Sequence, residues 1–437
     1  MTLATASLAA ALALAAAEAP PARASLEESL RRAEGAMREG AFAEAADAWM
    51  EAARMVPNHP GVLIRAGEAL ALSGRPAEGL EYLLRAGRQG GTGHLERIET
   101  SFASAGRADL TAALDLLRAN AGALATGTVA FSLAEKDLIP ESVAYDPREK
   151  VFYVGSLHKR KIVRVDASGD ARDFVPQAGS GLWSVLGIKV DQERREIWAN
   201  ACNLVDPDPP MVPDEAATRG RTAVFRFDLA TGKVVARYES GSKESPLCFN
   251  DLTPATEGAW YLSSGADGIF RVDPGKGTLE RFAAYDGMVN GIAASDDGRL
   301  LFLADHRRGV QVMDVASRQV RALRLPPDAS LAGVDGLYVR GRTVVAVQNA
   351  LTRGLARVVS AEMDPGLESV LCLRVLDRNR PEFDVPTTGV LVGGDLYYVA
   401  SSQLDSFDHG TIWPLDRLRQ SVVIRTPYAP RCGEQGA

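Results

Sequence analysis

Four polar residues in the second part of the chain have side-chain oxygens of the kind that hard cations prefer. Each stands at the start of a short aliphatic pattern, and they are Glu141, Asn250, Asn290 and Asp335. Two carboxylates and two amides form a ligand set suited to Ca²⁺, with Mg²⁺ and Mn²⁺ as the next candidates. Zn²⁺ is the fourth candidate and fits least, because none of the four is His or Cys. Taken singly, each Asn-Gly or Asp-Gly pair is an ordinary turn signal.

The same pattern opens six repeating units, whose other two first residues are Leu186 and Thr388. Each unit continues through a turn rich in Gly, Asp or Pro to a second and a third β-branched or aromatic strand. Six such units predict an all-β six-bladed β-propeller over residues 126–430, because radial repetition protects sheet edges that would otherwise be exposed. The strand pattern at Thr128–Ser132 precedes the first unit. We expect it to complete the last blade and close the ring.

The innermost strand of every blade faces the propeller axis, so the first residues of the units should meet at one end of a central channel. Five of these six residues are polar. Carboxylates that face one another repel when they are buried, and a cation removes that cost. The sequence therefore predicts a metal site formed by Glu141, Asn250, Asn290 and Asp335.

Residues 26–59 and 60–93 align with each other at a 34-residue period, with small residues where paired helices would cross and glycines between the helices. A weaker third pair follows, with Gly106 in its turn. The segment resembles the tetratricopeptide family, which predicts an α-helical domain over residues 25–122. Such a domain binds a peptide or a partner protein on its concave surface, or it is a structural appendage that caps the propeller or dimerises.

Residues 1–24 contain an Ala/Leu run from Leu8 to Ala17 followed by Glu18, a pattern typical of a secretory signal peptide. No Lys or Arg precedes Arg23, so an Ala-rich leader is the alternative. We expect a periplasmic or secreted protein, with a cytoplasmic one as the alternative. No later apolar run is long enough to predict a transmembrane span. A formal charge of −7 without a basic stripe argues against nucleic acid as a partner.

Four cysteines, at 202, 248, 372 and 432, lack the spacing of a zinc or thioredoxin site. Cys202 and Cys248 fall near the same end of neighbouring blades. They are candidates for a disulfide in an oxidising compartment, and free buried thiols are the alternative.

The Pro-Glu141-Ser, Asn250-Asp, Asn290-Gly-Ile and Asp335-Gly-Leu segments resemble the regucalcin, gluconolactonase and luciferin-regenerating enzyme family, and more distantly the paraoxonases. The resemblance covers about residues 129–427. It implies that Glu141, Asn290 and Asp335 bind the metal, that Asn250 contacts substrate or metal, and that Asp335 is the catalytic base. The family has an Arg two residues before the position of Asn250, where this chain has Cys248.

Further polar residues follow the second strands and should surround the channel mouth. His306 is a candidate proton carrier, because imidazole titrates near neutral pH. His158 and Asn349, together with Thr388 and Asn250, are candidate substrate-binding residues. The insertion at residues 203–221 is long enough to form a lid, and a solvated surface loop is the alternative.

These features predict a metal-dependent hydrolase of lactones or related esters, in which Asp335 or His306 takes a proton from water. The alternative is a non-enzymatic exported scaffold that has a structural metal and binds protein partners through its helical repeats. A third hypothesis is a carbon-bond former similar to strictosidine synthase, which shares the architecture.

Overall fold

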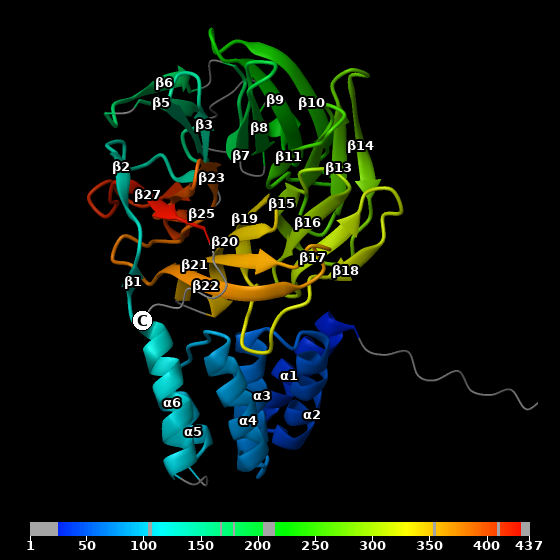
Figure 1. Ribbon diagram of the computed structural model, residues 1–437, viewed down its shortest axis with the longest axis vertical. Coiled ribbons are helices and arrows are strands. Elements are labelled where there is room, and N and C mark those ends of the chain that lie inside the picture. The colour runs from blue at the N-terminus through cyan, green and yellow to red at the C-terminus, as the bar shows by residue number, and fades with distance from the viewer. Residues whose placement is uncertain are drawn as a thin grey trace, which may run out of the picture.

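The computed structural model describes residues 25–103, 107–166, 168–177, 180–203, 215–352, 355–408 and 411–429. Within these residues the chain is a six-bladed β-propeller preceded by six helices (Figure 1). The predicted leader at residues 1–24, the turn at Gly106 and most of the insertion at residues 203–221 lie outside them. No helix in the described part of the chain has both the length and the apolar character needed to cross a membrane.

The helices form three consecutive pairs with a hydrophobic core of their own. They are α1 (Leu26–Glu39), α2 (Phe42–Met55), α3 (Pro60–Leu72), α4 (Pro76–Arg88), α5 (Leu95–Ser101) and α6 (Arg107–Ala121). Ser25 caps α1 by accepting a hydrogen bond from the Glu28 backbone, and Gly40 ends it in the left-handed conformation. A Cβ atom at Gly79 would lie 2.6 Å from the Gly67 carbonyl oxygen, so α3 and α4 can pack this closely only because both residues are glycines.

Six antiparallel sheets follow one another around the ring (Figure 1). Blade 1 has β3 (Pro140–Asp146), β4 (Val151–Ser156), β5 (Ile162–Val165) and β6 (Ala171–Val175), and blade 2 has β7 (Ser184–Asp191), β8 (Glu196–Asn203), β9 (Arg221–Asp228) and β10 (Val234–Gly241). Blade 3 has β11 (Leu252–Pro254), β12 (Trp260–Ser263), β13 (Ile269–Asp273) and β14 (Thr278–Ala283), and blade 4 has β15 (Val289–Ala294), β16 (Leu300–Asp305), β17 (Gly309–Asp314) and β18 (Val320–Ala322). The hydrophobic core of the ring lies between neighbouring blades, as in the cluster shared by β8, β9, β11 and β12.

The last two blades include strands from the segment that follows the helices. Blade 5 has β19 (Val334–Arg340), β20 (Thr343–Thr352), β21 (Leu355–Met363) and β22 (Val370–Arg378), with β1 (Leu124–Ala125) paired to β22. Blade 6 has β23 (Gly389–Val392), β24 (Asp395–Val399) and β27 (Ser421–Pro427), and β2 (Thr128–Leu133) pairs with β27 as its outermost strand. The predicted ring-closing strand is thus confirmed. A small hairpin of β25 (Phe407–Asp408) and β26 (Thr411–Ile412) precedes β27.

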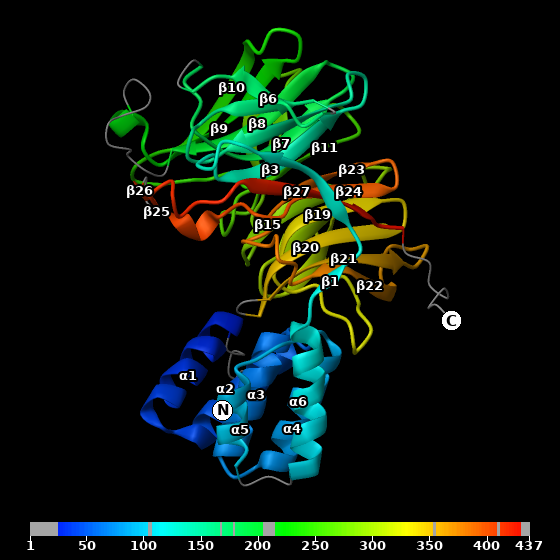
Figure 2. The same cartoon turned by 90° about the vertical axis from the view of Figure 1, so that its left-hand side faces the viewer.

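The helical domain packs against the ring beside blades 4 and 5 (Figures 1 and 2). The Asn58 amide donates hydrogen bonds to the carbonyl oxygens of Pro326 at 3.1 Å and Ala329 at 2.8 Å. The Gln89 amide reaches the Pro327 carbonyl oxygen at 3.0 Å, and Glu27 forms an ion pair with Arg307. These loops lie at the end of the blades where Asn290 and Asp335 begin their strands. The helices therefore border the candidate site described next.

Candidate functional site

β-Bulges turn the first residues of the innermost strands toward the channel. The pairing register shifts between Pro140 and Ser142 in β3, between Val289 and Ile292 in β15, and between Val334 and Leu337 in β19. Glu141, Asn290 and Asp335 therefore stand inside bulges, where the local twist redirects a side chain out of the ladder. The glycines that follow Asn290 and Asp335 are needed there, because a Cβ atom at Gly291 would lie 2.4 Å from the Asp335 carbonyl oxygen.

Three amides and one carboxylate form a continuous hydrogen-bonded row across blades 3, 4 and 5. The Asn250 amide donates to Asn290 Oδ1 at 3.2 Å, and the Asn290 amide donates to Asp335 Oδ1 at 3.2 Å. The Asn349 amide donates to Asp335 Oδ2 at 2.6 Å. The structure therefore brings together four residues that the sequence places far apart, including the candidate substrate residue Asn349.

Glu141 and Thr388 meet at the junction of blades 1 and 6. The Thr388 hydroxyl donates to the Glu141 carbonyl oxygen at 3.0 Å, and the Thr387 hydroxyl donates to the same oxygen at 2.7 Å. Thr388 thus fixes the backbone of Glu141. Among the described residues, no hydrogen-bond donor reaches the Glu141 carboxylate, so both of its oxygens are available to a ligand.

Burial strongly disfavours the charged forms of both channel carboxyls. It raises the pKa of Asp335 to about 7; the hydrogen bond from Asn349 opposes this shift, and the nearby Asp251 carboxylate adds to it. The pKa of Glu141 also lies well above its usual range, first because of burial and then because of Asp335 and Asp251. Two carboxyls with raised pKa values at one mouth mark a functional-site candidate.

The donor atoms of this site suit a hard divalent cation. The Glu141 carboxylate is free, and each Asp335 oxygen keeps a lone pair beyond its one amide bond. Within the described residues, no three His, Cys, Asp or Glu side chains gather closely enough to bind a metal on their own. Ligation at this site would therefore depend on the amide oxygens of Asn250 and Asn290 as well as on the two carboxylates.

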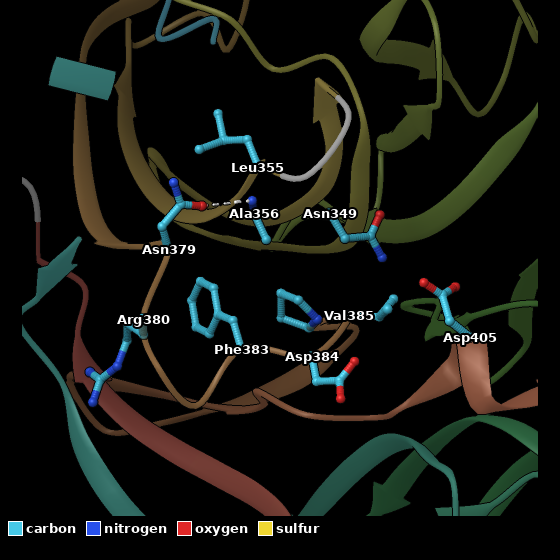
Figure 3. A pocket seen from close by; sticks show the side chains of 10 residues that line it. Asn349, Leu355, Ala356, Asn379, Arg380, Phe383, Asp384, Val385 and Asp405 are labelled. Atoms are coloured by element: carbon cyan, nitrogen blue, oxygen red, sulfur yellow. Dashed lines mark hydrogen bonds between the residues drawn. The ribbon is translucent and has the colours of Figure 1, made fainter. Parts of the chain in front are cut away.

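Asn349 also forms part of the wall of a pocket of about 420 Å³ (Figure 3). Phe383, Val385 and Leu355 give it an apolar side, and Asp384 and Asp405 give it an acidic rim. Since Asn349 also holds the Asp335 carboxylate, a molecule in this pocket would lie next to the channel mouth. The pocket is large enough for a small organic substrate.

The two candidate histidines form no side-chain hydrogen bond or ion pair with this row in the described part of the chain. Burial and Arg307 lower the pKa of His306, which lies near His59 of the helical domain. His158 is hydrogen-bonded through Nδ1 to the Asp137 carbonyl oxygen at 2.7 Å and packs against Phe407. None of the hydrogen bonds among the described residues joins either histidine to Asp335 or Glu141. The geometry therefore favours Asp335 over His306 as the proton acceptor.

Two charged residues of the channel were not predicted as site residues. Lys189 and Asp251 lie near the carboxyls, since the charges of both act on Glu141. The spacing from the blade start could have indicated Lys189 as a channel residue. Lys189 stands three residues after Leu186, and Tyr338 stands at the equivalent position, three residues after Asp335. On an innermost strand such a residue remains close to the axis.

A disulfide joins Cys202 at the end of β8 to Cys248, with the Cα atoms 5.3 Å apart. Cys248 lies two residues before Asn250, so the bond anchors the segment that leads to this channel residue. Cys372 is disulfide-bonded as well. Of the two alternatives for Cys202 and Cys248, the structure contains the disulfide.

No family model matches the sequence, and no curated protein matches it. Several solved structures share the fold. A gluconolactonase from Xanthomonas campestris is 15% identical with a TM-score of 0.45, over 70% of this chain and 97% of its own. A luciferin-regenerating enzyme is 14% identical with a TM-score of 0.44, over 70% and 95%. A chain of a nidogen–laminin complex is 13% identical with a TM-score of 0.40, over 54% and 80%. Similarity at this level describes a shared fold and assigns no function.

Proposed function

We propose that this protein is a metal-dependent hydrolase of lactones or related esters, with its active site at the channel mouth. The observation that carries the proposal is the row of Asn250, Asn290, Asp335 and Asn349, with the free Glu141 carboxylate nearby. A core needed only for packing gains nothing from two carboxyls whose ionisation burial makes costly. A site that binds a cation and moves a proton uses both.

The proposal assigns cation binding, proton transfer and substrate contact to residues of this site. Glu141, Asn250, Asn290 and Asp335 would hold the divalent cation, with Ca²⁺ as the first candidate. Such a cation supplies polarisation of the substrate carbonyl and stabilisation of the oxyanion. Asp335 would take a proton from the attacking water. Asn349 positions the Asp335 carboxylate and contacts the substrate in the adjacent pocket.

The disulfide and the helical domain bear on where the protein acts and on what else it binds. Disulfides persist in oxidising compartments, so the Cys202–Cys248 bond supports a periplasmic or secreted location. We further propose that the helical repeats are tetratricopeptide-like and bind a peptide or protein partner.

The first experiment measures hydrolysis of aldonolactones, γ-lactones and aryl esters with Ca²⁺, Mg²⁺, Mn²⁺, Zn²⁺ or a chelator. We expect turnover that requires a divalent cation. Replacing Glu141 by Gln or Asp335 by Asn should lower kcat by about 100-fold or more, since each change removes a charge that acts in the transition state.

The matched control is Asp286→Asn, which makes the same substitution at a fully exposed side chain in the loop before β15. It should retain wild-type turnover. Unchanged lactonase activity in Asp335→Asn would remove this residue from the mechanism. A protein without turnover whose melting temperature rises with the cation would instead support the scaffold hypothesis, and full activity in chelator would support a metal-free carbon-bond former.

A further inference from the structure

Lys189 reaches across the channel to the opposite side of the ring. It lies on β7 of blade 2, and its Nζ atom is 5.2 Å from the ring centroid of Tyr338 on β19 of blade 5. The same atom lies 3.3 Å from Asp251 Oδ1. The lysine side chain is only 20% exposed. An ammonium group therefore occupies the channel below the row of amides, although the proposed reaction gives it no role.

Asp251 is the ion-pair partner of the Lys189 ammonium, and its own position in the channel is unusual. The residue after the blade start is Gly in four blades and Ser in blade 1, and only blade 3 has a charged residue there. The Asp251 side chain is 4% exposed, and its Oδ1 also accepts a hydrogen bond from the Leu252 backbone at 2.8 Å. Its Oδ2 is buried without a hydrogen-bond partner among the described residues. A buried carboxylate with one oxygen that accepts no hydrogen bond needs a nearby positive charge to remain ionised.

The charges of the channel act on one another. Asp251 and Asp335 both raise the pKa of Glu141, whereas Lys189 lowers it. With all three carboxylates ionised, the channel carries three negative charges and one positive charge. The remainder of two negative charges matches one divalent cation.

We propose that Lys189 is a built-in cation of the channel, which neutralises Asp251 and thereby sets the affinity with which Glu141, Asn290 and Asp335 bind a divalent ion. This inference rests on the cation site of the proposed function and adds what sets its affinity. Loss of the ammonium leaves the Asp251 carboxylate uncompensated beside the site. The divalent ion then meets one more negative charge and binds more tightly.

The test counts Ca²⁺ ions bound per chain by equilibrium dialysis and titration calorimetry, and it needs no substrate. The wild type should bind one ion. Lys189→Met keeps most of the stem beside Tyr338 and removes the charge, so it should still bind one ion, about tenfold or more tightly than the wild type. Asp251→Asn leaves the ammonium uncompensated and should weaken binding of the single ion by about tenfold or more. The double variant restores the net charge and should bind one ion, with an affinity within roughly threefold of the wild type.

The outcomes separate the two proposals. If both the wild type and Lys189→Met bind one ion with equal affinity, the proposed cation site stands and the role of Lys189 is wrong. Weaker binding by Lys189→Met than by the wild type would overturn the role of Lys189 as well, and no ion in the wild type would overturn both proposals. If Lys189→Met alone fails to fold, the double variant decides: it should fold and bind one ion, and a double variant that does neither contradicts the inference.

Discussion

At Asp335, burial and a neighbouring negative charge raise the pKa of the carboxyl, whereas hydrogen bonds lower it. Two amides donate to its carboxylate, and such bonds favour the ionised form. Burial outweighs them and raises the pKa to about 7. In the proposed site a cation and a proton would therefore compete for the same side chain, and the outcome would depend on pH in the neutral range.

We predict that Asp335 contributes stability to the chelated protein that is lost as pH rises from about 4 to about 7, because an unfolded Asp titrates near 4 and the folded Asp335 near 7. Over this range the folded state binds a proton that the unfolded state has released, so raising the pH favours unfolding. Urea unfolding in chelator at several pH values measures the slope. Asp335→Asn should show a smaller decrease than the wild type. Identical slopes for the two proteins would show that Asp335 is not protonated in the folded state.

Residue types at the blade starts could be predicted from the sequence, because the repeat identifies equivalent positions. The roles of Lys189 and Asp251 could not, since a lysine at a strand position usually points to solvent. Only the curvature of the ring brings Lys189 over Tyr338. Asn349 was predicted as a substrate residue, but its hydrogen bond to Asp335 depends on how two strands of blade 5 pair.

At the scale of elements, blade 3 holds its channel residue differently from blades 4 and 5. Asn250 precedes the short strand β11, whereas Asn290 and Asp335 stand inside bulged ladders. The Cys202–Cys248 disulfide ties this segment to β8 of blade 2. A covalent bond thus supplies part of the rigidity that a longer ladder supplies elsewhere.

We predict that the Cys202→Ser/Cys248→Ser variant loses about 2–4 kcal/mol of unfolding free energy, the usual effect of removing a disulfide that closes a loop of this length. Ser at 202 can still reach the hydroxyl of Thr222, which now lies 3.5 Å from the Cys202 sulfur. Urea unfolding measures the stability, and Ca²⁺ titration measures the site. Both the unfolding free energy and the Ca²⁺ affinity should fall. Unchanged Ca²⁺ affinity in a destabilised protein would show that the disulfide does not position Asn250.

Strand patterns with regular spacing predicted the six blades and the ring-closing strand, because alternation and turn residues are local signals. The pairing of β1 with β22 was not predicted. Two residues are too few for any pattern, and the main anchor of this region is the Asp377 carboxylate, which accepts hydrogen bonds from the backbones of Thr126 and Gly127. The bulges escaped prediction because they depend on the partner strand.

At the scale of the whole molecule, the helical domain is joined to the ring by polar contacts around a partly buried histidine. His59 caps α3 by accepting a hydrogen bond from the Val62 backbone, and it lies near His306 and Arg307 of blade 4. Burial, followed by the smaller effects of His306 and Arg307, lowers the pKa of His59 to about 4. The neutral imidazole is therefore the form that fits the interface.

We predict that this interface weakens as pH falls from about 6.5 to about 4, because an unfolded His takes up a proton in this range and the folded His59 does not. Limited proteolysis of the connection between α6 and β2, in saturating Ca²⁺, measures the opening. His59→Asn keeps a good helix cap without a titrating group and should cut this pH dependence. Cleavage rates that rise equally in both proteins would assign the effect to other groups.

The docking of the helices on the ring could not be predicted from the sequence. The side-chain amides of Asn58 and Gln89 donate to the backbone carbonyl oxygens of Pro326, Pro327 and Ala329, and every residue type has such a carbonyl group. In the sequence, nothing distinguishes Asn58 and Gln89 from other polar residues of the helical segment. The two domains were predictable, but their arrangement was not.

Because β2 pairs with β27, the ring can close only after the ribosome has synthesised the chain through β27. Ribosomes produce β2 before any blade, and β27 after the other five blades are complete. Until then Phe131 and Leu133, both buried in the finished ring, lack the packing that β27 provides through Val423. A premature stop codon shortly before β27 would therefore leave a nearly complete protein with an open seam. Cellular quality control could recognise such a product by these two side chains.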